Sequence, residues 1–313
     1  MTDNLDIIVI GESLIELSTD KKLEYAEVFH KYYGGDVLNT AITATRLGSR
    51  VGFLTKVGND PFKDFLLDSW QTENIDISYV KVVEGYNGLY IVSNPDDGKK
   101  EMAYYRKKSA ATTLSIEDIP EEVIERSSIV YSTGITQSLS TSARGAVKKA
   151  FSIAGDKECL VAYDPNYKAT LIDIEEAKAA LEEVIEYIDI LILSNVHDAE
   201  RLMGINSADK IIKYFWDRGI PTIAVKMGMA GCAIGHNGEI NIIPPRQVSP
   251  VDSTGAGDAF NGGFLHGIAR GLTPFEAGKL ASIVASEQTR GWGAIQSIPN
   301  KDHVLEEFKK GEA

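Results

Sequence analysis

Two carboxylates and two glycines are gathered in one stretch of the chain, Val251-Asp252-Ser253-Thr254-Gly255-Ala256-Gly257-Asp258-Ala259-Phe260. Apolar residues then recur at helical spacing through Phe264 and Ile268, so a glycine-rich turn is expected to open a helix here. The first backbone N–H groups of such a helix lack partners and lie at the positive end of its dipole. The stretch therefore predicts a binding site for an anion, most naturally a phosphate.

Asp258 is the unusual residue of this turn, because a phosphate repels a neighbouring carboxylate that has no part in the reaction. We interpret Asp258 as a base that takes the proton from a hydroxyl attacking the phosphate. The backbone N–H groups of Gly255, Ala256 and Gly257 would then stabilise the charge on the transferred group, and Asp252 would orient the turn. The alternative is a plain glycine-rich turn with an aspartate in the first helical turn, where Asp is common.

Two further segments carry residues suited to a polar small molecule. In Gly34-Gly35-Asp36-Val37-Leu38-Asn39 the paired glycines allow a close approach of the backbone, and Asp36 and Asn39 can bond hydroxyls. Asp36 as a plain helix N-cap is the alternative. Arg106 follows Tyr104-Tyr105, and its forked guanidinium suits a carboxylate or phosphate; a basic strand end is the alternative.

Three more polar segments each follow an apolar run, where parallel sheets place their ligands. They are Asp164-Pro165-Asn166-Tyr167-Lys168, Ser194-Asn195-Val196-His197-Asp198 and Lys226-Met227-Gly228-Met229-Ala230-Gly231. The second could lie near the Mg²⁺ and phosphates of a nucleotide, and the third is a glycine turn that could wrap one. Each also reads as an ordinary turn, and His197 as a helix-start residue. Neither Gly-x-x-x-x-Gly-Lys-Ser/Thr nor Gly-x-Gly-x-x-Gly occurs, which argues against a Walker loop and a Rossmann-type oxidoreductase.

The elements that must position these residues alternate along the chain. Short apolar runs occur at Asp6–Gly11, Val51–Val57, Ile129–Thr133, Cys159–Tyr163, Ile190–Leu193 and Thr222–Lys226. Helical patterns lie between most of them, at Val37–Leu47, Phe62–Asn74, Ser142–Ala154, Ile174–Tyr187 and Ala208–Arg218. This alternation predicts an α/β fold, a parallel sheet with helices on both faces.

Two segments interrupt that alternation. Leu14–Tyr33 and Tyr86–Arg106 show strand-like alternation with turns, including a hairpin turn at Asn94-Pro95-Asp96-Asp97-Gly98. We expect a small inserted antiparallel β lid over 14–33 and 86–106, and an α/β core over 1–13, 34–85 and 107–313. Because a small sheet cannot bury both faces alone, this lid should cover the active-site mouth or a partner subunit.

The bulk composition narrows the class of partner. The 313 residues carry a net charge of −13, which argues against a nucleic-acid or anionic-membrane surface but not against an anionic substrate. Cys159 and Cys232 lie in apolar runs and are expected to be buried thiols. With no signal-like N-terminus and no apolar run of membrane-spanning length, a cytoplasmic protein is expected. Lys301–Ala313 reads as a charged amphipathic helix that caps the fold.

Several of these motifs together resemble the ribokinase-like (PfkB) family of sugar kinases, over nearly the whole chain. Gly34-Gly35-x-x-x-Asn39 looks like the N-terminal signature of that family. Asp252–Asp258 followed by Gly262-Gly263 looks like its C-terminal signature, which is highly specific. The resemblance implies a parallel sheet flanked by helices with a small β lid, and the transfer of a phosphoryl group from ATP, with Mg²⁺, to a sugar.

Within the family, Gly11-Glu12-Ser13-Leu14, Tyr104-Tyr105-Arg106 with Ser109-Ala110, and Asp164-Pro165-Asn166 look like 2-keto-3-deoxygluconate kinases. The residues that would then bind the sugar acid are Gly34, Gly35, Asn39, Tyr90, Tyr105, Arg106, Lys168 and Asp258, with Arg106 facing the carboxylate. Those that would line the ATP side are Asn195, Lys226, Gly228, Gly231, Thr254, Gly255 and Gly257. Asp198 would act on the metal indirectly, through water.

Three positions depart from the family pattern. Its Asn-x-x-Glu motif appears as Asn195-x-x-Asp198, Lys168 stands where Arg is frequent, and the loop Arg290–Ala294 carries no acid. Another kinase of the family, acting on fructose or a related neutral sugar, stays an alternative, as does a sugar- or nucleotide-binding relative without catalysis. The aromatic lid residues Tyr25, Phe29, Tyr32 and Tyr33 suggest a homodimer through the lid. A monovalent cation is a further candidate near the Asp252–Asp258 turn.

Overall fold

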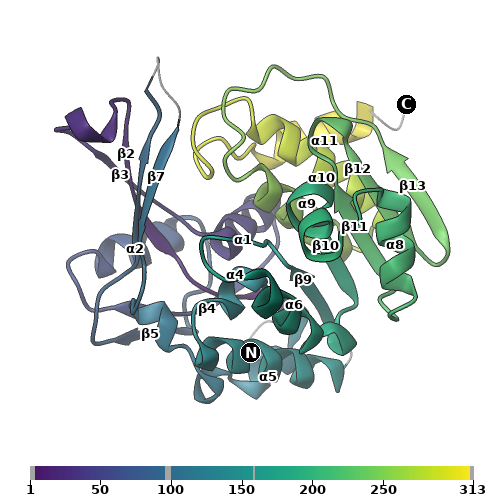
Figure 1. Cartoon of the computed structure of the whole chain (residues 1–313), viewed down its shortest axis with the longest axis horizontal. Coiled ribbons are helices and arrows are strands. Elements are labelled where there is room, and N and C mark those ends of the chain that lie inside the picture. The colour runs from purple at the N-terminus through teal and green to yellow at the C-terminus, as the bar shows by residue number, and fades with distance from the viewer. Residues whose placement is uncertain (1–3, 96–99, 158, 311–313) are drawn as a thin grey trace.

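A nine-stranded sheet forms the centre of the computed structural model, which describes residues 4–95, 100–157 and 159–310 (Figure 1). Its strand order is β13-β12-β11-β10-β9-β8-β1-β4-β5, parallel from β11 to β5, with β12 and β13 antiparallel at one edge. The strands of this sheet are β1 (Leu5–Ile10), β4 (Val51–Gly58), β5 (Val80–Val83), β8 (Ser127–Thr133), β9 (Leu160–Asp164), β10 (Ile190–Ser194), β11 (Thr222–Lys226), β12 (Cys232–His236) and β13 (Glu239–Ile243). All six apolar runs identified in the sequence are strands of this sheet.

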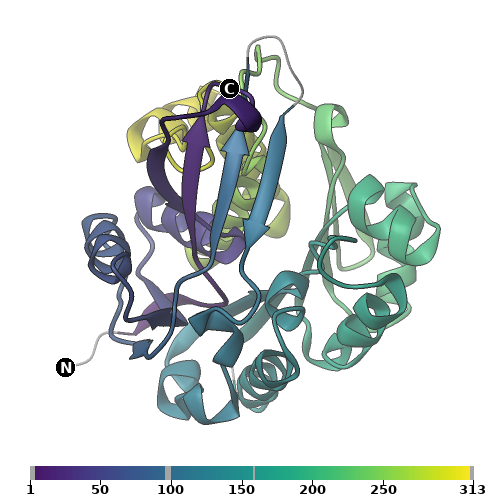
Figure 2. The same ribbon diagram turned by 60° about the vertical axis from the view of Figure 1, so that its left-hand side comes forward.

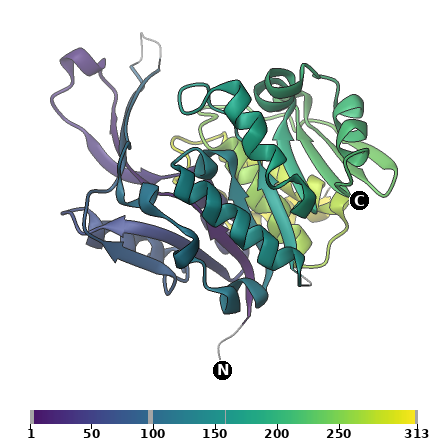
Figure 3. The ribbon, with the colours of Figure 1, turned by 60° about the horizontal axis from the view of Figure 1, so that its bottom comes forward.

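Helices cover both faces of the sheet, and Figure 3 shows teal helices on one side and yellow-green helices on the other. The α-helices are α1 (Asp36–Leu47), α2 (Lys63–Thr72), α3 (Glu121–Glu125), α4 (Gly134–Gln137), α5 (Thr141–Gly155), α6 (Ile174–Glu182), α7 (Glu200–Met203), α8 (Ala208–Trp216), α9 (Ala256–Ala269), α10 (Pro274–Gln288) and α11 (Lys301–Lys310). The predicted helix Ile174–Tyr187 is shorter, because Val184 (φ −123°) leaves the helical region and is buried, and a 3₁₀ turn follows at Ile185–Tyr187.

The two faces of the sheet explain why its strands read as unbroken apolar runs. In β1, Ile7 and Val9 pack with α1, α2, α9 and α10, whereas Ile8 and Ile10 pack with α5 and α8. All four side chains are fully buried. A strand covered on both sides has no polar face, so the α/β class predicted from these runs is confirmed.

A second sheet of four strands stands apart from the first and forms the lid (Figure 2). Its strands are β2 (Leu14–Thr19), β3 (His30–Gly34), β6 (Leu89–Ser93) and β7 (Glu101–Tyr105), in the order β3-β2-β6-β7. The expected lid is present, but it is mixed rather than antiparallel throughout, since the central pair β2 and β6 is parallel. Between β3 and β6 the chain returns to the core through α1, β4, α2 and β5, so both central strands leave the core in the same direction. The expected turn at Asn94–Gly98 lies largely outside the described residues.

The close packing of α1 against α9 brings two distant parts of the sequence together. A Cβ atom on Gly262 of α9 would lie 2.5 Å from Thr43 Cβ and 2.6 Å from the Thr40 carbonyl oxygen of α1. The glycine therefore sets how near the two helices come. This contact places Asn39 on α1 beside Asp258 on α9.

We expect Gly262→Ala to lower the free energy of unfolding by about 1–3 kcal/mol, because the added methyl forces α1 and α9 apart. Denaturant melts followed by circular dichroism measure the change. Gly145→Ala on α5 is the matched control, since its Cβ would meet its nearest neighbour at an ordinary 3.5 Å. Equal stability of the two variants would show that the helices do not need Gly262.

The remaining expectations about the fold concern its cysteines and its C-terminal segment. Cys159 and Cys232 are free and buried, as expected. α11 packs on α10 through the buried Val304, so it caps the core while its other face carries charge. Within residues 4–95, 100–157 and 159–310, no helix combines the length and hydropathy needed to cross a membrane.

Candidate active site

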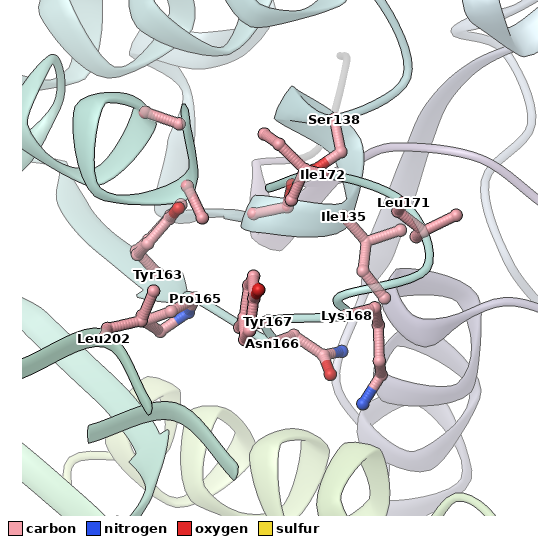
Figure 4. A pocket seen from close by; sticks show the side chains of 13 residues that line it. Ile135, Ser138, Tyr163, Pro165, Asn166, Tyr167, Lys168, Leu171, Ile172 and Leu202 are labelled. Atoms are coloured by element: carbon pink, nitrogen blue, oxygen red, sulfur yellow. The ribbon is translucent and has the colours of Figure 1, made fainter. Parts of the chain in front are cut away.

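A cleft of about 1350 Å³ lies between the lid and the carboxyl ends of β9, β10 and β11. Pockets for one small molecule typically measure roughly 300–1000 Å³, so this cleft is large enough for two ligands side by side. A second pocket, beneath the loop that carries Asn166 and Lys168, holds only about 10 Å³ and is lined by Tyr163 and Leu202 (Figure 4). Asn166 and Lys168 line both this small pocket and the large cleft.

The glycine-rich turn opens α9 on one wall of this cleft. Gly255 is the N-cap residue, with φ +80°, and a Cβ there would lie 2.6 Å from Ala294 Cβ. Only glycine fits both the backbone angle and the space. Because α9 begins at Ala256, the N–H groups of its first turn have no partners within the helix. The turn and helix predicted from the sequence are therefore present, with the geometry of an anion site.

Asp258 lies in the first turn of α9 and faces groups from other elements. Its Oδ2 accepts a hydrogen bond of 2.8 Å from the Asn39 side-chain amide. Burial and the nearby Asp36 carboxylate raise the pKa of Asp258 to about 7, while the Asn39 hydrogen bond and Lys226 oppose that rise. A carboxylate that is half ionised near neutral pH is well matched to general-base catalysis.

We expect Asn39→Ala to move the acidic limb of the pH–rate profile to higher pH. The Asn39 amide stabilises the ionised form of Asp258, so its loss raises the pKa of the base and a higher pH is needed to deprotonate it. The measurement is kcat from pH 5.5 to 9. A limb that stays in place, or moves to lower pH, would show that Asn39 does not control this ionisation.

A buried polar network supports the floor of the cleft. Lys226 Nζ donates to Asp164 Oδ2 at 2.7 Å and to Asn261 Oδ1 at 3.0 Å. Asn261 in turn donates to Asp164 at 2.7 Å and to the Tyr131 hydroxyl at 2.9 Å. Burial lowers the pKa of Lys226, but the Asp164, Asp198 and Asp258 carboxylates together outweigh burial and raise that pKa, so the lysine stays charged. A fixed positive charge thus lies beside the anion turn.

The lid contributes the opposite wall. Arg106 follows β7, is 9% exposed and forms an ion pair with the Glu12 carboxylate. Burial lowers the pKa of Arg106 to about 10, so it is protonated at neutral pH. The Tyr90 hydroxyl donates to the buried Glu16, and its ring stacks on Tyr104 with the centroids 5.6 Å apart. This wall is therefore aromatic, with one cation that is paired to a carboxylate.

A lysine links the lid to the anion turn across the cleft. Lys100, just before β7, lies 3.6 Å from Asp252 Oδ1 and donates to the Thr254 hydroxyl. Asp252 Oδ1 also accepts from the Thr254 N–H at 3.0 Å, and its Oδ2 accepts from the Gly293 N–H at 3.1 Å. Asp252 thus organises the turn, and its two carboxylate oxygens are held by protein donors.

The sequence profile of the pfkB family of carbohydrate kinases matches residues 4–301. The chain belongs to this family. It is 30% identical to a 2-dehydro-3-deoxygluconokinase from Thermoproteus tenax, over 97% of this chain and 94% of the relative. It is also 30% identical to Fructokinase-1 from Zea mays, over 97% and 98%. The fold matches that of an E. coli protein described as a putative ribokinase II in complex with ATP and Mg²⁺, with TM-score 0.89, 24% identity and coverage of 98% and 99%.

Most of the site residues predicted for this pfkB kinase line the cleft. They are Gly35, Asn39, Tyr90, Arg106, Lys168, Asp198, Lys226, Gly228, Gly231, Thr254, Gly255, Ala256, Gly257 and Asp258. Gly34, Tyr105 and Asn195 are not among the lining residues. A Cβ on Gly34 would lie 3.0 Å from the Tyr90 hydroxyl, so Gly34 makes room for that side chain. Asn195 donates weakly to the Asn206 carbonyl at 3.5 Å.

Tyr105 differs from its expected place because neighbouring residues of a strand point to opposite faces. Tyr90, Tyr104 and Met102 line the cleft of the kinase, whereas Tyr105 is 59% exposed. Tyr104 has the same parity as Arg106, so strand alternation alone would have selected Tyr104 over Tyr105 once Arg106 was chosen. Tyr104 was therefore not among the predicted site residues, although strand alternation relative to Arg106 pointed to it.

Other contacts of the kinase site became visible only in three dimensions. Asp36 Oδ2 accepts from the Thr133 hydroxyl at 2.6 Å and from the Asn166 amide at 3.3 Å. Burial raises the pKa of Asp36, and the Asp36 carboxylate in turn raises the pKa of Asp258. Asn261 gave one signal, as a polar residue between the apolar Phe260 and Phe264. No local pattern indicated the contact between Asp36 and Thr133.

The described residues offer little for direct metal binding, since no group of three or more His, Cys, Asp or Glu in them could hold an ion. Asp198 lines the cleft of the kinase and is buried, but its oxygens accept from the backbone N–H groups of Tyr167 at 2.8 Å and Ser194 at 2.7 Å. The single carboxylate of Asp198 fits a Mg²⁺ ion that is held mainly by phosphate oxygens. Because Mg²⁺ keeps much of its hydration shell, Asp198 would contact it through water.

Proposed function

We propose that this kinase transfers the γ-phosphoryl group of ATP to the terminal hydroxyl of 2-keto-3-deoxygluconate, giving the 6-phosphate. The observation that carries the proposal is a buried, protonated guanidinium, Arg106, on the lid wall of the cleft that Asp258 faces. A forked guanidinium suits the carboxylate of a sugar acid. The 30% identity to a 2-dehydro-3-deoxygluconokinase supports the same choice.

In this mechanism Asp258 takes the proton from the hydroxyl on carbon 6, and the resulting alkoxide attacks the γ-phosphorus in line. The N–H groups of Gly255, Ala256 and Gly257 stabilise the charge that spreads over the transferred group. Lys226 adds a fixed positive charge near them. Closure of the lid excludes water, which would otherwise hydrolyse ATP. Mg²⁺, when bound, neutralises phosphate charge, with Asp198 orienting its water shell.

A neutral sugar, with fructose as the leading case, is the second candidate. The observation in its favour is the ion pair between Arg106 and Glu12, which cancels the net charge of the lid wall. The 30% identity to Fructokinase-1 from Zea mays supports it equally. Lys168, exposed at the cleft, would contact either substrate.

A substrate panel separates the candidates. The purified kinase is assayed with ATP and Mg²⁺ by coupled ADP detection, on 2-keto-3-deoxygluconate, gluconate, fructose and ribose. We expect kcat/KM to be about a hundredfold higher on the keto-acid than on fructose, the usual range for a charge-assisted contact. A preference for fructose would replace the proposed acceptor, and a failure of every sugar to stimulate ADP release would indicate a relative without sugar kinase activity.

We further propose that the kinase is a homodimer paired through its lid. Tyr25 is 71% exposed, and Phe29 and Tyr32 are also exposed, whereas Tyr33 packs on Phe65 of α2. An exposed aromatic surface is more costly on a monomer than in an interface. Light scattering during size exclusion tests this, with a mass near twice 34.1 kDa expected.

A further inference from the structure

The amide nitrogen of Gln288 lies at the centre of a cage of oxygen atoms. Gln288 ends α10 and is fully buried. Its Nε2 is 2.7 Å from the Thr254 carbonyl oxygen, 2.9 Å from Ser297 Oγ, 3.2 Å from the Gly293 carbonyl oxygen and 3.5 Å from the Ala294 carbonyl oxygen. An amide carries two hydrogens, so four acceptors are more than it can satisfy fully.

The neighbours of this cage fix which atom of the amide occupies it. The Ser297 hydroxyl donates its own proton to the Gly293 carbonyl at 2.5 Å, so its oxygen can only accept from Gln288. Exchanging the amide oxygen and nitrogen would set an acceptor against four acceptors. The amide nitrogen therefore occupies the cage. Three carbonyls and a hydroxyl around one point are also the kind of oxygen ligands that a hard cation binds in proteins.

The charge beside the cage is already compensated. Hydrogen bonds from Thr254 and Gly293 outweigh burial and hold the pKa of Asp252 below its usual range, so it is a carboxylate. Lys100 Nζ lies 3.6 Å from its Oδ1. Gly293 and Thr254, which belong to the cage, also donate to Asp252. The cage and Asp252 together connect the anion turn to the loop at 291–297.

We propose that the Gln288 amide takes the place of a monovalent cation behind the anion turn, so that this kinase works without one. The sequence led us to consider such a cation near Asp252–Asp258, and the residues do not fit it, because the amide fills the cage of oxygens. The tethered amide braces the carbonyl of Thr254, next to Gly255, and thereby positions the turn that begins α9. Gln288 is a positioning residue and does not touch the reacting atoms.

The first test is the cation dependence of the wild-type kinase. Activity on the best sugar of the panel is compared in chlorides of K⁺, Na⁺, NH₄⁺ and tetramethylammonium at one ionic strength. We expect all four rates to agree within about twofold, since no cation site is left to fill. A rise of about tenfold or more with K⁺ or NH₄⁺ over tetramethylammonium would overturn the proposal.

The second test empties the cage with Gln288→Ala and fills it with a non-donor in Gln288→Met. In tetramethylammonium, both variants should lose about tenfold or more in kcat/KM, as buried acceptors lose their donor. K⁺ should restore the alanine variant to within about threefold but not the methionine variant, whose side chain still occupies the space. Exposed Gln296→Ala on the same loop is the matched control and should resemble wild type.

The thermal midpoint gives a readout that needs no substrate. K⁺ in place of tetramethylammonium should raise the midpoint of Gln288→Ala by several degrees and leave that of wild type and Gln288→Met unchanged. The proposal would be overturned if Gln288→Ala kept the wild-type kcat/KM and thermal midpoint. It would also be overturned if K⁺ neither stabilised nor reactivated that variant, because Gln288 would then have a structural role only. Because this arm contains no sugar, a wrong substrate assignment leaves its result intact.

Discussion

Replacing Asp258 with asparagine should lower kcat by about a thousandfold while ATP binds as tightly as in the wild-type kinase. General bases contribute roughly 10²–10⁴ to a rate, and Asp258 is the carboxylate at the anion turn whose pKa is raised to about 7. Asparagine keeps the shape of the side chain and the contact with Asn39 but cannot accept a proton. Coupled ADP detection measures kcat, and equilibrium binding of a fluorescent ATP analogue measures affinity. Asp68→Asn, an exposed aspartate on α2, is the control.

The same residue predicts a specific pH dependence. Because the base acts when deprotonated, wild-type kcat should rise between about pH 6 and 8 and level off above the pKa near 7. The folded pKa lies above that of an unfolded aspartate, near 3.9, so ionisation of Asp258 costs stability as the pH rises from about 4 to 7. Asp258→Asn removes this cost and should melt no lower than wild type at pH 8. Near-normal turnover by this variant would remove Asp258 from the chemistry.

Replacing Arg106 with alanine should reduce kcat/KM on 2-keto-3-deoxygluconate by about a hundredfold and on fructose by less than about fivefold. Loss of one partner of a buried charge pair typically costs about 2–5 kcal/mol, and only the keto-acid supplies a carboxylate. The substitution also leaves Glu12 without its cation, which repels an anionic substrate further. The steady-state constants for both sugars measure the difference. Equal losses on both sugars would take the carboxylate role from Arg106.

Two companion variants separate the contribution of the Arg106 charge from those of its forked geometry and its ion pair. Arg106→Lys keeps the charge but not the fork, so an intermediate loss on the keto-acid is expected. Glu12→Gln frees the guanidinium from its ion pair and should lower KM for the keto-acid. If Glu12→Gln instead improved fructose and left the keto-acid unchanged, the neutral sugar would be the better assignment.

Local features of the site were predictable because their causes lie within a few residues. The turn Asp252–Asp258 contains the glycine that takes φ +80° and the aspartate that bonds the N–H two residues on. The nine-strand sheet was predictable in kind because strands buried on both faces must be apolar throughout. The lid was predictable as an insertion but not in its strand directions, since the parallel pairing of β2 with β6 depends on the path of the chain between them.

Features that depend on contacts between distant residues were not predictable from the sequence. The Asn39 amide reaches Asp258 across 219 positions, and the Lys226–Asp164 pair spans 62. The ion pair between Arg106 and Glu12 was not foreseen, and the role of Arg106 toward a substrate carboxylate stays a prediction. Nothing in the sequence of α10 marks Gln288 as the centre of an oxygen cage, because the four oxygens come from two separate loops.

The sequence by itself predicted the class of chemistry, through a glycine-rich helix start suited to phosphate and an aspartate proposed to act on a hydroxyl there. These follow from backbone angles and hydrogen bonds inside one short stretch. The tertiary structure decided how that aspartate behaves, because its pKa depends on burial in the cleft and on Asp36, Asn39 and Lys226 from other elements. It likewise decided which tyrosine of β7 faces the cleft and what fills the space behind the turn. Electrostatics and packing act through space, so only the fold could set them.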